Sequence, residues 1–197
     1  MPRFVVKDSF YNKAKKEGYR ARSAYKLEEI QERFKLITRG DRILDLGAAP
    51  GSWLQMESLL VGDKGVVVGV DILPVKPLPQ RNIIVKQADI RELNIEALLA
   101  DAGTNAFDVI TSDVAPNLSG IKEVDNANVV DLYLAVISMV TAALRKGGNF
   151  LIKLFFSAEL KDMESKVKPY FSKVSVFKPK SSRDVSSEIY LVCMGKR

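Results

Sequence analysis

Residues 42–53, RILDLGAAPGSW, decide the fold of this chain. The pattern predicts a short strand over 42–47 that ends in glycine, then a tight turn, then a helix that begins at Ser52. Gly47 and Gly51 are separated by Ala-Ala-Pro, so the turn lacks both the G-x-G-x-x-G of a dinucleotide-binding loop and the G-K-[ST] of a P-loop. The turn therefore favours a smaller nucleoside ligand over a dinucleotide.

Outward from this turn, β-branched apolar runs alternate with amphipathic segments. Strands are predicted over 42–47, 65–72, 82–89, 107–114, 149–155, 173–179 and 188–195, and helices over 22–35, 52–60, 94–102, 127–145 and 158–171. Strands that alternate with helices predict an α/β fold with a mostly parallel, seven-stranded sheet. The last two strands are joined by a loop alone, which predicts an antiparallel hairpin at one edge.

Local signals set several of these boundaries. Ser23 is a candidate N-cap for the first helix, and residues 73–80 contain three prolines, which predicts a loop. Gly147-Gly148 is expected to stop the helix over 127–145. That helix is predicted to bury one apolar face, made of Val130, Leu134, Ile137 and Val140.

Length and composition limit the class of protein. The 197 residues suit one domain, with a basic helical extension over 1–36 and a core over 42–195. The chain has no histidine, which excludes a Ser-His-Asp triad and most zinc sites, and no metal site is expected. A single cysteine, Cys193, and the lack of a signal-peptide pattern indicate a cytoplasmic protein. We expect a monomer that does not engage a membrane.

The net positive charge lies in the first 26 residues. Their net charge of +6 equals that of the whole chain, so a basic arm extends from a neutral body. Such an arm suggests a polyanion as partner, and interleaved aromatic rings favour nucleic acid, although a solvated helix face is the alternative. The basic residues are Arg3, Lys7, Lys13, Lys15, Lys16, Arg20, Arg22 and Lys26; a second set near the C-terminus is Lys173, Lys178, Lys180 and Arg183.

Three acidic residues mark the ends of successive predicted strands. Asp71, Asp89 and Asp113 lie at the ends of the second, third and fourth predicted strands. Ligands in such folds lie beyond the carboxyl ends of the strands, where Asp71 is placed to bind ribose hydroxyls and Asp89 to bind an adenine amino group. Each acid alone is equally well explained as a strand-end or capping residue. Together they suit a nucleoside with a positive centre, such as S-adenosylmethionine.

Seven segments in order resemble one known family, the FtsJ/RrmJ-type ribosomal RNA large-subunit (uridine-2′-O-)-methyltransferases, also called the RlmE family. The main departure is Ser52, where many members carry glycine. The segments are RARSAYKL (20–27), DLGAAPGSW (45–53), VGVDI (68–72), QADI (87–90), SDVAPNLSG (112–120), FLIKLF (150–155) and SSEIYLV (186–192).

The resemblance implies a Rossmann-like methyltransferase fold, S-adenosylmethionine as cofactor, and 2′-O-methylation of a uridine in large-subunit ribosomal RNA on the assembled subunit. Ribosomal RNA and the large ribosomal subunit are the implied partners. The implied catalytic residues are Lys26, Asp113, Lys153 and Glu188. The implied cofactor contacts are Gly51, Trp53, Asp71, Asp89 and Asp113.

Lys153 is unusual on the residues alone. It lies within an otherwise apolar strand, where a lysine is costly unless it is paired, although a lysine that reaches water from the strand end is an alternative. If the four residues converge, we expect Lys153 to deprotonate or orient the 2′-hydroxyl. Lys26 and Glu188 would position the ribose and Lys153, and Asp113 would orient Lys153.

Three other functions remain open from the sequence. The nearest is 2′-O-methylation of transfer RNA. A catalytically inactive RNA-binding or ribosome-assembly protein is a second, although it would have no need of Lys153. A nicotinamide dehydrogenase is a third, and the missing G-x-G-x-x-G opposes it.

Overall fold

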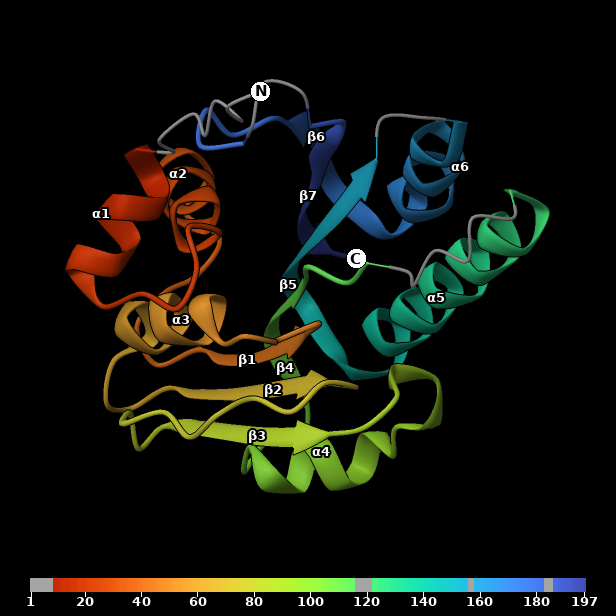
Figure 1. Cartoon of the computed structure of the whole chain (residues 1–197). Helices are drawn as coiled ribbons and strands as arrows, with labels where there is room; N and C mark the ends of the chain where they lie inside the picture. Colours follow the sequence, from red (N-terminus) through yellow and green to blue (C-terminus); the bar gives the residue numbers. More distant parts are fainter. Residues whose placement is uncertain (1–8, 116–121, 156–157, 183–185) are drawn as a thin grey trace, which may run out of the picture.

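The computed structural model describes residues 9–115, 122–155, 158–182 and 186–197, and within them the strands form one seven-stranded sheet in the order β3-β2-β1-β4-β5-β7-β6 (Figure 1). Strands β1 to β5 are parallel, whereas β7 pairs antiparallel with both β5 and β6. The predicted α/β class, parallel sheet and antiparallel edge pair are confirmed. The strands are β1 (Arg42–Leu46), β2 (Val66–Asp71), β3 (Ile83–Gln87), β4 (Phe107–Ser112), β5 (Leu144–Phe155), β6 (Phe171–Phe177) and β7 (Glu188–Lys196).

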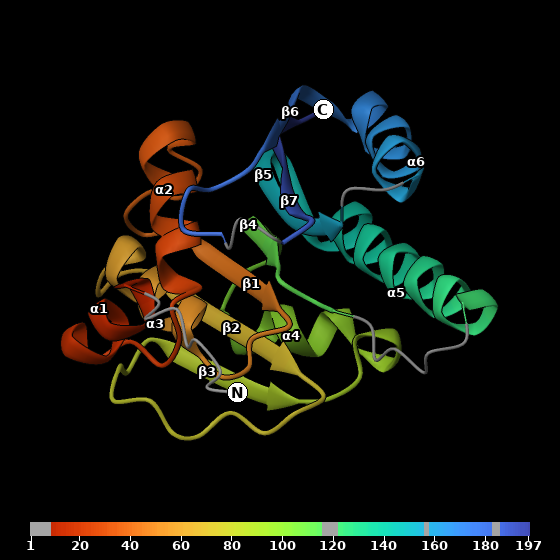
Figure 2. The ribbon, with the colours of Figure 1, turned by 45° about the horizontal axis from the view of Figure 1, so that its top comes forward.

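Helices cover both faces of this sheet (Figures 1 and 2). Helices α2 and α3 pack on one face, and α4, α5 and α6 pack on the other. Among the described residues, no helix combines the length and the apolar character needed to cross a membrane. The helices are α1 (Ser9–Glu17), α2 (Ala24–Phe34), α3 (Ser52–Val61), α4 (Ile95–Asp101), α5 (Lys122–Ala143) and α6 (Ala158–Val167), with 3₁₀ turns η1 (Ile90–Glu92) and η2 (Lys168–Tyr170).

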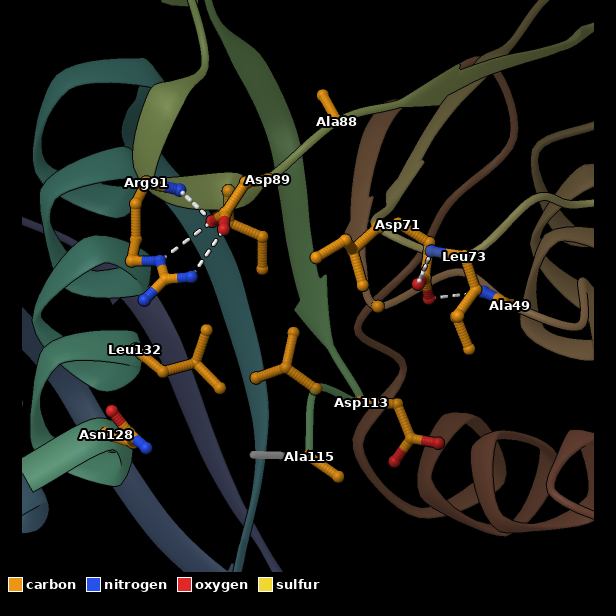
Figure 3. Close-up of a pocket in the computed structure, with 14 residues that line it drawn as sticks. Ala49, Asp71, Leu73, Ala88, Asp89, Arg91, Asp113, Ala115, Asn128 and Leu132 are labelled. Carbon is orange, nitrogen blue, oxygen red and sulfur yellow. Dashed lines mark hydrogen bonds and ion pairs between the residues drawn. The ribbon is translucent and has the colours of Figure 1, made fainter. Parts of the chain in front are cut away.

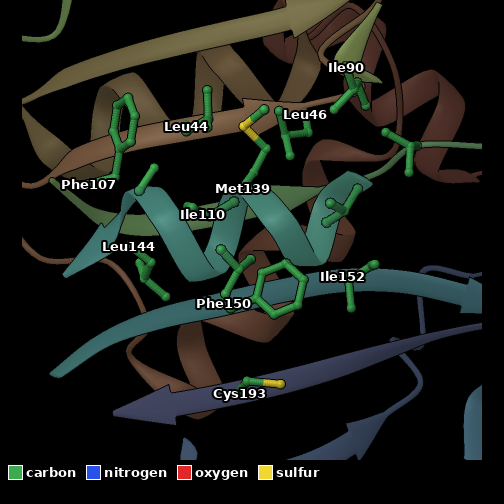
Figure 4. Packing of buried hydrophobic residues seen from close by; sticks show 14 of the residues in the cluster. Leu44, Leu46, Ile90, Phe107, Ile110, Met139, Leu144, Phe150, Ile152 and Cys193 are labelled. Carbon is green, nitrogen blue, oxygen red and sulfur yellow. The ribbon is translucent and has the colours of Figure 1, made fainter. Parts of the chain in front are cut away.

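Alternation along the strands produces two hydrophobic clusters, one on each face. On β1, Ile43 packs toward α2 and α3, while Leu44 and Leu46 pack toward the opposite helices. In the larger cluster, Met139 of α5 lies beside Leu44 and Leu46 of β1, and Phe150 of β5 belongs to the same cluster (Figure 4). The sheet is therefore buried on both faces and leaves its strand ends to form a ligand site.

The junction between α5 and β5 differs from the prediction. α5 ends at Ala143, β5 begins directly at Leu144, and Gly147-Gly148 lies inside the strand rather than ending the helix. The register of β5 against β4 shifts in this segment. A Cβ at Gly148 would lie 2.8 Å from the carbonyl oxygen of Asp108, so glycine permits the close approach of the two strands.

The predicted buried face of α5 was also partly wrong. Val130 and Leu134 are 41% and 47% exposed, whereas Tyr133, Val136 and Val140 are buried against the sheet. The helix is rich in apolar residues all round, so its sequence periodicity did not specify one face.

Two helix ends differ for local reasons. The predicted helix over 158–171 ends at Val167, because Pro169 supplies no backbone donor, and Phe171 already belongs to β6. Ser23 does not cap α2: its backbone is helical and its hydroxyl contacts the hydroxyl of Ser52 instead, at 2.8 Å between the oxygens.

Candidate functional site

A cavity of about 460 Å³ opens at the carboxyl ends of β1 to β4 (Figure 3). Each of these four strands contributes to its wall at or just beyond its last residue. This is the edge at which open parallel sheets bind ligands, and the volume suits a nucleoside-sized molecule. The lining residues that the site uses are Gly47, Asp71, Asp89, Arg91, Asp113 and Leu132.

Gly47 closes β1 against β4. Its φ is 84°, and a Cβ there would lie 2.8 Å from the backbone nitrogen of Val114. Backbone hydrogen bonds hold the two strand ends together here, because Asp113 N donates to the carbonyl oxygen of Leu46 at 3.0 Å. The glycine therefore permits both the turn and the tight cavity wall, as its place after the strand predicts.

Asp71 is the last residue of β2, and its carboxylate organises the neighbouring loops. One oxygen accepts from Ala49 N and the other from Leu73 N, each at 2.8 Å (Figure 3). These bonds aim a carboxylate into the cavity and connect it to the glycine turn. The strand-end position predicted for Asp71 is confirmed.

Asp89 lies two residues beyond the end of β3, not in the strand as predicted, and begins the η1 turn. Its carboxylate accepts from Arg91 N and Nε at 2.9 Å each, and from Arg91 Nη2 (Figure 3). The hydrogen bonds from Arg91 outweigh the effect of burial and lower the pKa of Asp89 to about 2. Asp89 is therefore a fixed negative charge on the cavity wall.

Asp113 directly follows β4, lines the cavity and contacts Lys153. The Lys153 Nζ lies 3.2 Å from Asp113 Oδ1 and donates to the Asp113 carbonyl oxygen at 2.7 Å. Tyr190 Oη donates to the same Oδ1 at 3.2 Å. Burial raises the pKa of Asp113 despite the opposing charges of Lys153 and Lys26.

Lys153 is 5% exposed, which contradicts the alternative of a lysine that reaches water from the strand end. On β5 it alternates with Ile152 and Leu154, which pack into the larger cluster on the opposite face. Its cross-strand neighbour on β7 is Tyr190. Lys153 is thus a buried lysine whose amine contacts a carboxylate, as the chemistry of a buried polar group requires.

A second lysine–carboxylate pair lies beside the first. Lys26, in the first turn of α2, donates from Nζ to Glu188 Oε2 at 2.6 Å, although 162 positions separate them in the sequence. Burial opposes ionisation of Glu188, but the hydrogen bond and charge of Lys26 outweigh it, so the pKa of Glu188 is lowered. The positive charges of Lys26 and Lys153 both act to lower the pKa of Asp113 and that of Glu188. The structure therefore brings Lys26, Asp113, Lys153 and Glu188 together, and their catalytic role stays a prediction.

Gly51 and Trp53 lie away from the lining of this cavity. Trp53 is buried, donates from Nε1 to the Ser23 carbonyl oxygen at 2.9 Å, and packs 5.9 Å from the ring of Tyr190. Gly51 precedes α3 with a φ of 107°. Their contact with a cofactor stays a prediction.

Sequence reasoning did not identify Arg91 or Tyr190 as site residues. Arg91 follows Asp89 at the start of a short turn, where an arginine can fold back onto the capping carboxylate. Tyr190 lies two residues after Glu188 on β7, so both side chains point to the same face of the sheet as Lys153. The period of two along β7 was the available signal.

A buried acidic pair beneath the turn was also missed. Asp45 and Glu57 are fully buried, and Thr111 Oγ1 lies 2.8 Å from Glu57 Oε1 and 3.3 Å from Asp45 Oδ1. Burial raises the pKa of Glu57 to about 8 and that of Asp45 well above its ordinary value. Burial of two adjacent carboxyl groups favours the protonated form of at least one.

Part of the basic arm is visible in the structure. Lys13, Lys15 and Lys16 are exposed on α1, whereas Arg3, Lys7 and Arg183 lie outside the described residues. Not every aromatic ring of the arm is free to stack on bases: Tyr25 is buried, and Lys13 lies 4.3 Å above its ring. The exposed basic surface therefore includes α1.

Fold and cavity together define a Rossmann-like α/β protein with a nucleoside-type site, and residues 19–196 match the FtsJ-like methyltransferase family. Ribosomal RNA large subunit methyltransferase E of Methanothrix thermoacetophila is 48% identical over 187 residues, which cover 94% of this chain and 71% of that protein. The protein of the same name from Syntrophobacter fumaroxidans is 43% identical over 194 residues, 98% of each chain.

A solved structure gives the same result. The crystal structure of a Plasmodium falciparum protein described as a ribosomal RNA methyltransferase matches with a TM-score of 0.78 at 30% identity, over 90% of this chain and 98% of that one. The chain belongs to the FtsJ-like methyltransferase family. The resemblance seen in the sequence is confirmed.

Proposed function

We propose that this chain transfers a methyl group from S-adenosylmethionine to the 2′-hydroxyl of a uridine ribose in large-subunit ribosomal RNA, on the assembled subunit. The observation that carries the proposal is the position of Asp113. This residue both lines the nucleoside-type cavity and holds Lys153, so the ligand site and the two lysine–carboxylate pairs share one group.

The residues of the cavity suit S-adenosylmethionine. The Asp71 carboxylate at the end of β2 is placed to accept from ribose hydroxyls, and Asp89 is placed to accept from the adenine amino group. A wall that carries Asp71, Asp89 and Asp113 suits a cofactor with a positive sulfonium, and the tight turn at Gly47 allows close approach. When bound, S-adenosylmethionine supplies an electrophilic methyl group.

The chain's own residues hold the acceptor. Asp113 and Tyr190 fix the position of Lys153, whose Nζ hydrogen-bonds with the 2′-hydroxyl of the ribose. Lys26, held by Glu188, positions the same ribose from α2. Alignment of two reactants can lower a barrier by roughly 7–11 kcal/mol, so positioning is a large part of this mechanism.

Lys153 has two candidate actions at that hydroxyl, and one variant separates them. As a neutral amine, Nζ takes the proton; as an ammonium, it orients the oxygen. Lys153→Arg keeps an orienting cation but cannot take a proton near neutral pH. Substantial turnover by Lys153→Arg supports orientation, and loss of turnover supports proton transfer.

Two observations support ribosomal RNA as the substrate. The relatives carry the name ribosomal RNA large subunit methyltransferase E, and the exposed lysines of α1 offer a basic surface to a polyanion. We also propose the cytoplasmic location expected from the sequence, where large ribosomal subunits are found.

The test is a comparison of substrates with labelled S-adenosylmethionine. We expect transfer to large ribosomal subunits that lack the modification, and much weaker transfer to free ribosomal RNA or to transfer RNA. Preferential labelling of transfer RNA would contradict the proposed substrate. Tight binding of NAD with no binding of S-adenosylmethionine, measured by calorimetry, would contradict the proposed reaction.

A further inference from the structure

The linker Gly18–Ser23, between α1 and α2, is attached to the segment 50–55 that opens α3. Gln55 donates from Nε2 to the Gly18 carbonyl oxygen at 2.9 Å and accepts at Oε1 from Arg20 N at 2.9 Å. At the other end of the linker, Ser23 contacts both Ser52 and Trp53. The basic arm is therefore fixed directly to the glycine turn that borders the cavity.

Within this linker, the Arg20 side chain donates hydrogen bonds to two different loops. Its Nη1 donates to the carbonyl oxygens of Pro50 at 2.9 Å and Lys76 at 2.7 Å, and its Nη2 donates to that of Pro77 at 2.5 Å. Pro50 belongs to the turn after β1, and the other two belong to the loop after β2. One guanidinium thus joins the turn that carries Ala49 to the loop that carries Ile72 and Leu73, and all three residues line the cavity.

The packing around Gly51 agrees with this connection. A Cβ at Gly51 would lie 3.0 Å from Arg20 Nη1 and 3.2 Å from Val75 Cγ1. Its φ of 107° also lies in the region that favours glycine. Gly51 therefore allows the guanidinium to approach the turn closely.

The same linker sets the start of the helix that carries Lys26. The hydroxyls of Ser23 and Ser52 lie 2.8 Å apart, and α2 begins at the next residue, Ala24. Lys26 lies in the first turn of that helix and pairs with Glu188. Contacts that fix the cavity loops thus also fix the position of Lys26.

We propose that Arg20 is a positioning residue that couples the cofactor cavity to Lys26, and not a phosphate contact of the basic arm. This inference rests on the proposed function, because it assigns the cavity to S-adenosylmethionine. It divides the basic arm into two parts: Arg20 holds the loops of the enzyme, while exposed lysines such as Lys16 face the RNA.

The experiment compares Arg20→Ala with Lys16→Ala in two binding assays. Calorimetry measures the affinity for S-adenosylhomocysteine without RNA, and a salt series measures the affinity for large-subunit ribosomal RNA. We expect Arg20→Ala to weaken binding of S-adenosylhomocysteine about 10-fold or more, because it removes hydrogen bonds from a charged donor. For this variant, the slope of the logarithm of RNA affinity against the logarithm of salt concentration should stay at the wild-type value.

Lys16→Ala provides the opposite pattern. It should leave binding of S-adenosylhomocysteine unchanged and reduce the salt slope of RNA binding by about 1. Wild-type affinity of Arg20→Ala for S-adenosylhomocysteine, with a reduced salt slope, would overturn the inference and assign Arg20 to RNA. If the wild-type chain itself does not bind S-adenosylhomocysteine, the proposed function fails rather than the role of Arg20.

Arg20→Lys keeps the inference testable if Arg20→Ala does not fold. A lysine keeps the charge but cannot reproduce the fork of the guanidinium, so we expect partial rescue of cofactor affinity. In methyl transfer, Arg20→Lys should raise the KM for S-adenosylmethionine by a larger factor than it lowers kcat. A variant with wild-type KM and wild-type affinity would contradict a positioning role.

Discussion

The two parts of the site differ in the partners of their charged groups. At the cavity, Asp71 and Asp89 accept hydrogen bonds from backbone N–H groups and from Arg91, so they are fixed acceptors. In the second part, Lys26 of α2 and Lys153 of β5 are buried, and each contacts a carboxylate. Under the proposed function, the first part binds the cofactor and the second acts on the ribose hydroxyl. Substitutions should therefore separate binding from turnover.

The largest expected effect is at Lys153. Lys153→Met keeps the length of the side chain but removes its amine, and positioned acid–base groups contribute roughly 10²- to 10⁴-fold to a rate. We expect kcat to fall within this range while the affinity for S-adenosylhomocysteine stays close to wild type, measured by methyl transfer and by calorimetry.

Lys166→Met, at an exposed lysine of α6, is the matched control. Because Lys153→Met leaves Asp113 without its cation, thermal unfolding should verify that the variant is folded. Near-normal turnover by a folded Lys153→Met protein would exclude Lys153 from the chemistry.

A smaller and opposite effect is expected at Asp71. Asp71→Asn removes a charged acceptor, and hydrogen bonds to charged groups contribute about 1.5–3 kcal/mol, so binding should weaken about 10- to 100-fold. At saturating S-adenosylmethionine, kcat should be largely retained. Asp63→Asn, at an exposed position before the amino end of β2, should alter neither quantity. A loss of kcat with unchanged affinity would contradict the assignment of binding to one part of the site and turnover to the other.

The last prediction concerns the stability of the fold instead of methyl transfer. The pKa of Glu57 is raised to about 8 in the folded chain from an ordinary value of 4.5. The folded state therefore keeps a proton that the unfolded state loses, and the free energy of unfolding should fall as pH rises from about 4.5 to 8, by at most about 1.4 kcal/mol per pH unit for one proton.

Glu57→Gln should flatten that slope and stabilise the chain near pH 8, because an amide can accept from Thr111 without ionising. Urea unfolding between pH 5 and 8 measures the slope, and Glu96→Gln, an exposed change on α4, is the control. A slope in Glu57→Gln equal to that of the wild type would show that Glu57 is not the group that keeps the proton in the folded state.

The cavity was largely predictable from the sequence. A strand, a glycine turn and an acid at each strand end are local patterns, and parallel strands bring their carboxyl ends to one edge. Asp71 lies where predicted, while Asp89 lies just past its strand because it begins the η1 turn. Local patterns are sufficient to predict this cavity because each parallel strand brings the loop after it to the same edge of the sheet.

The lysine–carboxylate pairs were not predictable from local patterns. Lys26 and Glu188 meet only because β7 lies between β5 and β6, and the sequence pattern does not specify that strand order. The resemblance to a family supplied the set of residues. Arg20 was counted with the basic arm for the same reason: its carbonyl partners lie in loops distant in sequence. Long-range contacts of this kind follow from topology.

The most direct test of the central proposal is the identity of the methylated atom. Large subunits that lack the modification are incubated with labelled S-adenosylmethionine and this chain, and the RNA is digested to nucleosides. We predict that the label appears in 2′-O-methyluridine from a single position of large-subunit ribosomal RNA. Label on a base, or no transfer by a chain that binds S-adenosylhomocysteine, would contradict the assignment of the two lysine–carboxylate pairs to the ribose hydroxyl.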